Sequence, residues 1–88
     1  MPLDELLNSF DPNLRGPLKR QILNFALAHR NIKKGPAGGG SLDFELTKVR
    51  AAEAAASLKS APYRLDNNTL AQIIINPNAW IDEIYDSL

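Results

Sequence analysis

Glycine is concentrated in one short segment of this chain, and that segment limits the fold more than any other feature. Four of the five glycines lie within Gly35–Ser41. Glycine has no side chain to pack and loses more backbone entropy on ordering than any other residue, so such a run is typical of a linker. The sequence therefore predicts two helical halves, residues 1–34 and 42–88, that form one composite domain and are joined by a flexible linker over residues 35–41. The run Gly38–Ser41 fits a natural hinge and also an engineered joint between two segments.

Prolines divide the first half into helical segments. Apolar residues at helical spacing predict a short helix over residues 2–10. Pro12 and Pro17 each follow a residue that resembles a helix cap, so we expect a tight corner over residues 12–16 and a new helix from Pro17 to about Arg30. One apolar stripe of this second helix consists of Leu18, Ile22, Phe25, Ala26 and His29.

The second half begins with the strongest helix-forming segment of the chain. Residues 42–59 follow a natural N-cap, Ser41, and contain the alanine-rich stretch 50–56. Residues 42–47 also alternate apolar and polar as a strand does, but we prefer a helix because no second convincing strand exists to pair with them. Two apolar faces result on this helix, and they indicate two packing neighbours: Leu42, Leu46, Val49 and Ala56 on one, and Phe44, Ala51, Ala55 and Leu58 on the other.

Two further helices are predicted towards the C-terminus. Residues 66–69 supply several caps for a helix over residues 70–75, although the β-branched residues 73–75 also fit a short buried strand. Asn76 before a proline then restarts the chain as an amphipathic helix over residues 78–88 with an acidic outer surface. The predicted fold is all-α, a small bundle of four or five short helices.

The charge of the chain is unevenly distributed, although its formal total is zero. Residues 1–36 contain six basic and three acidic side chains, a net charge of +3. Residues 61–88 contain one basic and four acidic side chains, a net charge of −3. Such a division lets a chain bind a polyanion, dock its own ends on each other, or pair with another copy head to tail.

Length and composition exclude several classes of protein. A chain of 88 residues is one domain at most and buries only about 60% of its unfolded surface, so a partner can complete its core. It has no cysteine, which excludes disulfides, thiolate metal sites and cysteine nucleophiles, and favours the cytoplasm. Neither a leader pattern nor an apolar run of membrane-spanning length is present, so no membrane is expected.

The sequence offers no recognisable set of catalytic residues. The glycine-rich segment lacks the Lys-Ser/Thr pair that a phosphate-binding loop requires. The single histidine, His29, lies on the apolar stripe beside Arg30 and Asn31, and Asp82 and Asp86 fit a solvated surface. We therefore predict no enzyme activity, no catalytic residue, no metal site, no cofactor and no small-molecule substrate.

The most informative candidates for binding lie at the C-terminus. An amphipathic helix with Trp and Tyr suits insertion into a groove of another protein or of a second copy, and it equally suits closure of the chain's own core. We predict a non-enzymatic protein–protein interaction or assembly module that self-associates through helices, with partner-binding residues Trp80, Ile81, Ile84, Tyr85 and Leu88.

A second functional class is a small regulatory protein that binds nucleic acid. Residues 15–34 contain six basic side chains and no acidic one, which would neutralise several phosphates on one duplex. A solvated basic rim explains the same charges. The residues that would contact nucleic acid are Lys19, Arg20, Arg30, Lys33 and Lys34.

Overall fold

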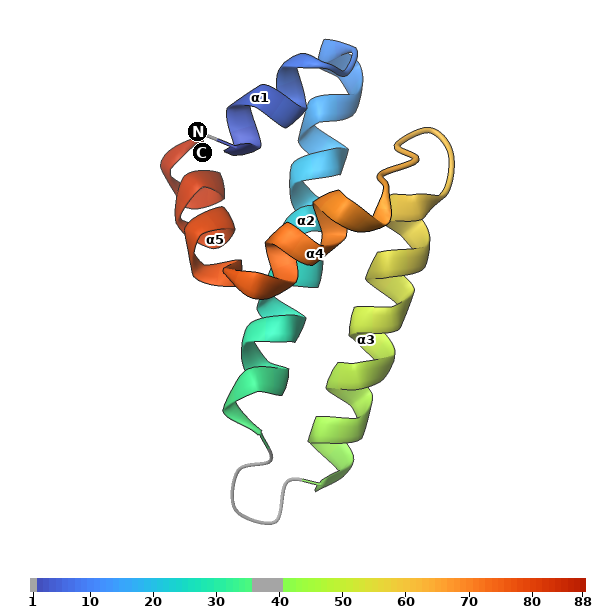
Figure 1. Ribbon diagram of the computed structural model, residues 1–88, viewed down its shortest axis with the longest axis vertical. Helices are drawn as coiled ribbons and strands as arrows, with labels where there is room; N and C mark the ends of the chain where they lie inside the picture. Colours follow the sequence, from blue (N-terminus) through green and yellow to red (C-terminus); the bar gives the residue numbers. More distant parts are fainter. Residues whose placement is uncertain (1, 36–40) are drawn as a thin grey trace.

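The computed structural model describes residues 2–35 and 41–88, with side chains of the second part from residue 43 onward. The described residues form five helices and no strand, so the predicted all-α bundle is confirmed (Figure 1). The question of a natural or engineered joint at Gly38–Ser41 falls largely outside these residues. The helices are α1 (Pro2–Asn8), α2 (Pro12–Lys34), α3 (Ser41–Lys59), α4 (Asn67–Ile75) and α5 (Pro77–Asp86).

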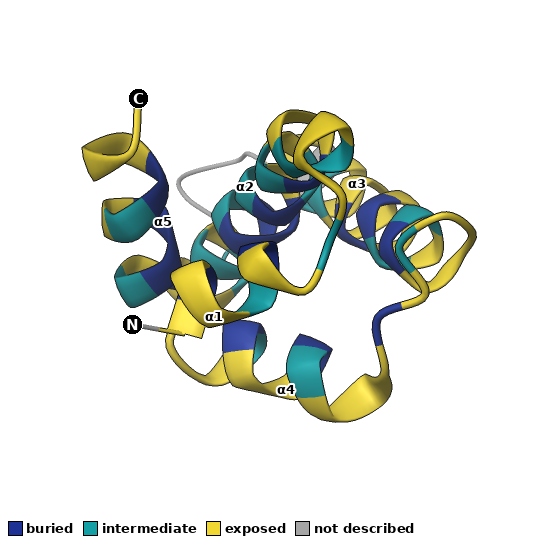
Figure 2. Ribbon diagram, turned by 90° about the horizontal axis from the view of Figure 1, so that it is seen from above, coloured by how far each residue is buried: buried dark blue, intermediate teal, exposed yellow. Residues whose placement is uncertain are grey.

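Helix α2 is the central element of the fold. It packs along α3, and α1, α4 and α5 also contact it (Figure 1). The buried faces of α2, α3 and α5 turn toward one another (Figure 2). Leu18, Ile22 and Phe25 of α2 are at most 1% exposed, and every buried side chain in the described part of the chain is apolar. The apolar stripe predicted for this helix therefore forms the centre of the core.

The start of α2 differs from the prediction. The helix begins at Pro12, where the Asp11 carboxylate accepts a hydrogen bond of 3.1 Å from the amide of Asn13, and it continues through Gly16 and Pro17. The predicted corner over residues 12–16 is therefore wrong. Asp11 caps the helix directly before a first-turn proline, so the chain needs no second helix start. Burial of the apolar stripe that follows offsets the free-energy cost of the backbone hydrogen bond that Pro17 cannot donate.

The actual corner between α1 and α2 is closed by an arginine. Arg15 donates from Nε to the carbonyl oxygen of Leu7, in the last turn of α1, at 2.9 Å and to that of Phe10, in the corner, at 3.1 Å. The other end of α2 lies one turn beyond the predicted Arg30. It ends at Gly35, whose φ of 75° is a conformation that favours glycine and whose amide donates to the carbonyl of Ile32.

Three helices form in the second half as predicted, but α4 begins at Asn67, three residues before the predicted Leu70, and α5 spans Pro77–Asp86 and not 78–88. Residues 43–47 are helical, so the strand alternative is wrong, and so is the strand alternative for residues 73–75. Helix α4 begins at a side-chain cap, because the Asp66 carboxylate accepts from the Thr69 amide at 2.8 Å. Asn76 occupies the expected cap position before α5, but its side chain makes no capping hydrogen bond.

The acidic C-terminal segment packs against the basic first half within one chain. The amide of Leu3 donates to the Glu83 carboxylate at 3.0 Å, which satisfies an N–H in the first turn of α1. Lys19 of α2 donates to the Ser87 hydroxyl at 3.2 Å. The two ends of the chain therefore lie together, but neither contact is an ion pair: the donor to Glu83 is a backbone amide, and the acceptor for Lys19 is a hydroxyl.

Candidate interaction surface

Helix α5 is mainly a core element. Trp80, Ile81 and Ile84 are 3%, 2% and 1% exposed, and they belong to the central apolar cluster. Tyr85 and Leu88 are 53% and 85% exposed. Of the five residues predicted to bind a partner, three are thus packed inside the folded chain and two are on its surface. The same helical spacing serves both purposes, so periodicity alone could not separate them.

The residues predicted to bind nucleic acid do not form one open patch. Lys19 donates a hydrogen bond to the Ser87 hydroxyl, and Lys33 donates to the carbonyl oxygen of Ile75, at the end of α4, at 2.8 Å. The Nε atom of Arg30 is buried and has no hydrogen-bond partner among the residues that the structure describes. Arg20 and Lys34 are the two that are exposed and make no side-chain hydrogen bond within the described residues. Two of these five basic side chains, Lys19 and Lys33, are thus engaged by the second half of the chain.

His29 is a boundary residue against the core. Its ring packs edge-on against Phe25, with 4.6 Å between ring centroids and 72° between the ring planes. Burial lowers the pKa of His29, and the positive charge of Lys33 lowers that pKa further. The imidazole is therefore neutral near pH 7.

Helix α3 has one packed face and one exposed face. Ala51, Ala54 and Leu58 are at most 5% exposed and face α2. On the opposite side, Leu46 is 42% and Val49 is 51% exposed. We define the outer face of α3 as Leu46, Val49, Glu53 and Ala56, all of them exposed.

The sequence predicts Leu46, Val49 and Ala56 of this outer face to be packing residues and does not mark them as candidate site residues. The signal that could have placed it there is spacing. Positions 46, 49, 53 and 56 alternate steps of three and four residues, the heptad spacing of helices that pair side by side. Within the described residues, no second helix of this chain covers that face. Leu46 and Val49 are therefore open to solvent in the part of the chain that the structure describes.

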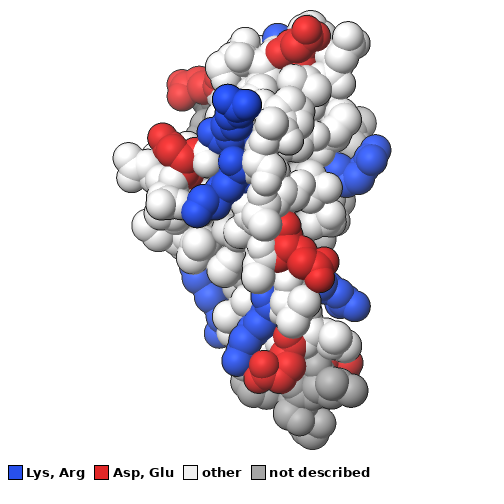
Figure 3. Space-filling model, turned by 90° about the vertical axis from the view of Figure 1, so that its right-hand side faces the viewer, with Lys and Arg blue, Asp and Glu red and all other residues white. Residues whose placement is uncertain are grey.

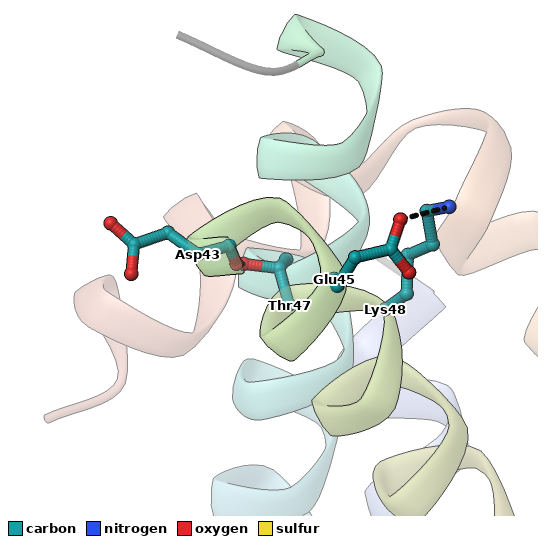
Figure 4. A network of polar contacts seen from close by, with 4 residues as sticks. All are labelled: Asp43, Glu45, Thr47 and Lys48. Carbon is teal, nitrogen blue, oxygen red and sulfur yellow. Dashed lines mark hydrogen bonds and ion pairs between the residues drawn. The ribbon is translucent and has the colours of Figure 1, made fainter. Parts of the chain in front are cut away.

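Charges of both signs border the outer face. Figure 3 looks onto this side of the molecule and shows basic and acidic side chains interspersed along an uncharged surface. In the first turns of α3, the Lys48 ammonium contacts the Glu45 carboxylate at 3.1 Å, and the Thr47 hydroxyl donates to the Asp43 carbonyl oxygen (Figure 4). The Lys48 ammonium also lies 4.9 Å from the ring centroid of Phe44. These contacts lie within one helix and are exposed, so they are weak.

Two grooves flank the contact between α2 and α3. The polar groove has a volume of about 600 Å³. Its polar lining includes the side-chain amides of Gln21, Asn24 and Asn31 of α2 and the charged side chains of Arg50 and Glu53 of α3. The apolar groove, of about 460 Å³, lies on the other side and is lined in part by α4. Glu53 of the outer face and its neighbour Arg50 are both exposed and line the polar groove.

Comparison with protein-family models, with curated proteins and with solved structures finds no match to this chain. Within residues 2–35 and 41–88, no helix has both the length and the apolar character needed to cross a bilayer. In the same part of the chain, no three His, Asp or Glu side chains gather as a metal site would require.

Proposed function

We propose that this chain is a non-enzymatic assembly module that self-associates by pairing the outer faces of α3 from two copies. The observation that carries the proposal is the exposure of Leu46 and Val49, at 42% and 51%, opposite a fully packed face of the same helix. Exposed aliphatic side chains at heptad spacing gain free energy when a second helix covers them. Ala56 is small enough for the two backbones to approach closely.

An antiparallel arrangement satisfies the spacing. It places Leu46 opposite Ala56 of the second copy and Val49 opposite Glu53 of the second copy, and the two-fold axis repeats both contacts. A large side chain then meets a small one at each end of the pair. The interface is isologous, which is the commonest form of a homodimer interface.

Charge favours the antiparallel direction over the parallel one. In a parallel pair, the Glu53 carboxylates of the two copies would face each other across the seam. In the antiparallel pair, the Arg50 guanidinium lies beside the Glu53 carboxylate of the second copy, twice by symmetry. Charges at the edges of a helix pair set its orientation in this way.

Sedimentation equilibrium with charge-reversal variants tests this proposal. Arg50→Glu and Glu53→Arg each place like charges together and are expected to weaken the dimer at least about tenfold, which corresponds to about 1.4 kcal/mol. The double variant restores the opposite-charge pairs and is expected to regain most of the affinity. Arg20→Glu, an exposed position of α2, is the matched control. Equal weakening by Arg20→Glu, or no recovery in the double variant, would contradict the proposed pairing.

We also propose that the module is not an enzyme and acts in the cytoplasm. Support for the first point is that the contacts of His29 within residues 2–35 and 43–88 are with aromatic Phe25 and basic Lys33, and none is with an acidic group that could orient it. Support for the second is the absence of cysteine, since packing alone then stabilises the fold in a reducing compartment.

A further inference from the structure

The apolar groove is a second unoccupied surface, separate from the outer face of α3. Its floor contains Phe25 and Leu70, which are 1% and 6% exposed. Ile32, Ala55 and Ile74 are half-buried along it. The groove opens between α3 and α4, so it is a trough rather than an enclosed cavity. Solvent therefore reaches apolar side chains from three different helices.

The side chains along the walls of the apolar groove are small. Ala51, Ala52 and Ala55 of α3 and Ala71 of α4 all line it. Alanine walls let the backbone of an inserted helix approach the floor closely. A helix placed in such a trough uses apolar side chains at i, i+3 or i+4 and i+7 as anchors.

The charged and titratable side chains that line this groove are all basic. Lys48 and Lys59 of α3 and His29 of α2 line it, and no Asp or Glu is among its described lining residues. His29 is neutral near pH 7 because its pKa is lowered, so the two lysines carry the charge. The contact of Lys48 with Glu45 is exposed and exchanges readily for an incoming carboxylate.

We infer that the apolar groove binds an amphipathic helix of another protein whose apolar stripe is bordered by acidic residues. The apolar floor and alanine walls accommodate the stripe, and Lys48 and Lys59 attract the acidic border. This binding does not depend on self-association, because the groove and the outer face of α3 share no residue. Both surfaces are open on the same monomer.

The test uses two synthetic helix-forming peptides of about four turns. Both carry Leu at i, i+3, i+4 and i+7; one has Glu at the bordering positions and the other has Lys at the same positions. Fluorescence anisotropy of the labelled peptides is measured against the full chain at low and moderate salt. The Glu peptide is expected to bind at least about tenfold more tightly than the Lys peptide, and the difference shrinks as salt rises.

Two exposed neighbours on α4 provide a matched pair of variants. Ala71 lines the groove and Gln72 does not, although both are exposed on the same helix. Ala71→Glu is expected to weaken binding of the Glu peptide about tenfold, whereas Gln72→Glu changes it less than about twofold. The same titrations on Val49→Glu, which disrupts only the outer face, are expected to match the wild type, so failure of self-association is distinguishable from failure of this inference.

Several results would overturn the inference. They are absence of Glu-peptide binding, equal binding of the Glu and Lys peptides, and equal effects of the two α4 variants. Binding of dodecanoate with no binding of either peptide would also overturn it, and would identify the groove as a site for a small anionic amphiphile.

Discussion

Replacing Leu58 and Leu46 by alanine, one at a time, compares the two faces of α3 within a single helix. Leu58 is 0% exposed and belongs to the core cluster. Leucine-to-alanine changes at such sites cost about 2–5 kcal/mol. The whole chain of 88 residues is expected to have a free energy of unfolding of about 4–13 kcal/mol at about 0.05–0.15 kcal/mol per residue. Leu58→Ala therefore removes a large part of the stability.

Leu46→Ala is expected to behave differently. Leu46 is already 42% exposed in the monomer. Full burial of a leucine is worth about 1.5–3 kcal/mol, so removing this half-exposed side chain costs about 1 kcal/mol or less. Its main effect falls on association, where the second copy would otherwise cover it.

Urea unfolding followed by the fluorescence of Trp80 measures both variants. Trp80 is the only tryptophan and is 3% exposed, so its emission reports loss of the core. A loss of about 3 kcal/mol lowers the urea midpoint by about 2 M at a slope of about 1.5 kcal/mol/M. Measurements at low micromolar concentration keep association out of the comparison. Equal destabilisation by Leu46→Ala and Leu58→Ala would refute the assignment of an inner and an outer face.

Further predictions concern the core, a titrating histidine and a helix cap. Trp80→Ala is expected to lower the free energy of unfolding by about 3–5 kcal/mol, measured by circular dichroism; loss of dimer with unchanged stability would contradict its core role. The folded chain holds the pKa of His29 below its ordinary 6.5, so the unfolded chain binds more protons in the window below 6.5 and stability falls as pH drops through it. His29→Gln is expected to flatten that slope in melts between pH 7 and 5, and an unchanged slope would argue against burial of the imidazole. Hydrogen bonds from Thr69 lower the pKa of Asp66, so its capping contribution is lost as pH falls through the folded value. Asp66→Asn is expected to retain much of the cap without this acid dependence, whereas Asp66→Ala loses the cap; identical melts for the two would contradict the capping role.

Local signals in the sequence were sufficient for most helix positions. Apolar stripes, the Asp66 cap and the proline after Asn76 each act within one or two turns, so they could be recognised without the rest of the fold. The start of α2 could not be recognised from such local signals. Whether the helix restarts at Pro12 or at Pro17 depends on packing of the following stripe and on Arg15, whose acceptors lie in the preceding helix and corner.

The candidate site was harder to predict than the fold. Trp80 looked like an interface residue because large aromatic side chains serve cores and interfaces alike. Only the packing of α5 on α2 shows that it is buried. Conversely, Leu46 and Val49 looked like ordinary packing residues, and their exposure depends on which face of α3 meets α2. Assigning a residue to core or surface required the arrangement of all five helices of the described chain.

The most direct test of self-association through α3 is sedimentation equilibrium of the wild type and Val49→Glu over a wide concentration range. Val49 is 51% exposed, so a glutamate there is accommodated by the monomer and disrupts only a paired outer face. We expect a reversible monomer–dimer equilibrium for the wild type and a monomer for Val49→Glu, with closely similar urea midpoints at low concentration. A wild-type chain that stays monomeric at millimolar concentration, or a Val49→Glu variant that dimerises as the wild type does, would contradict it.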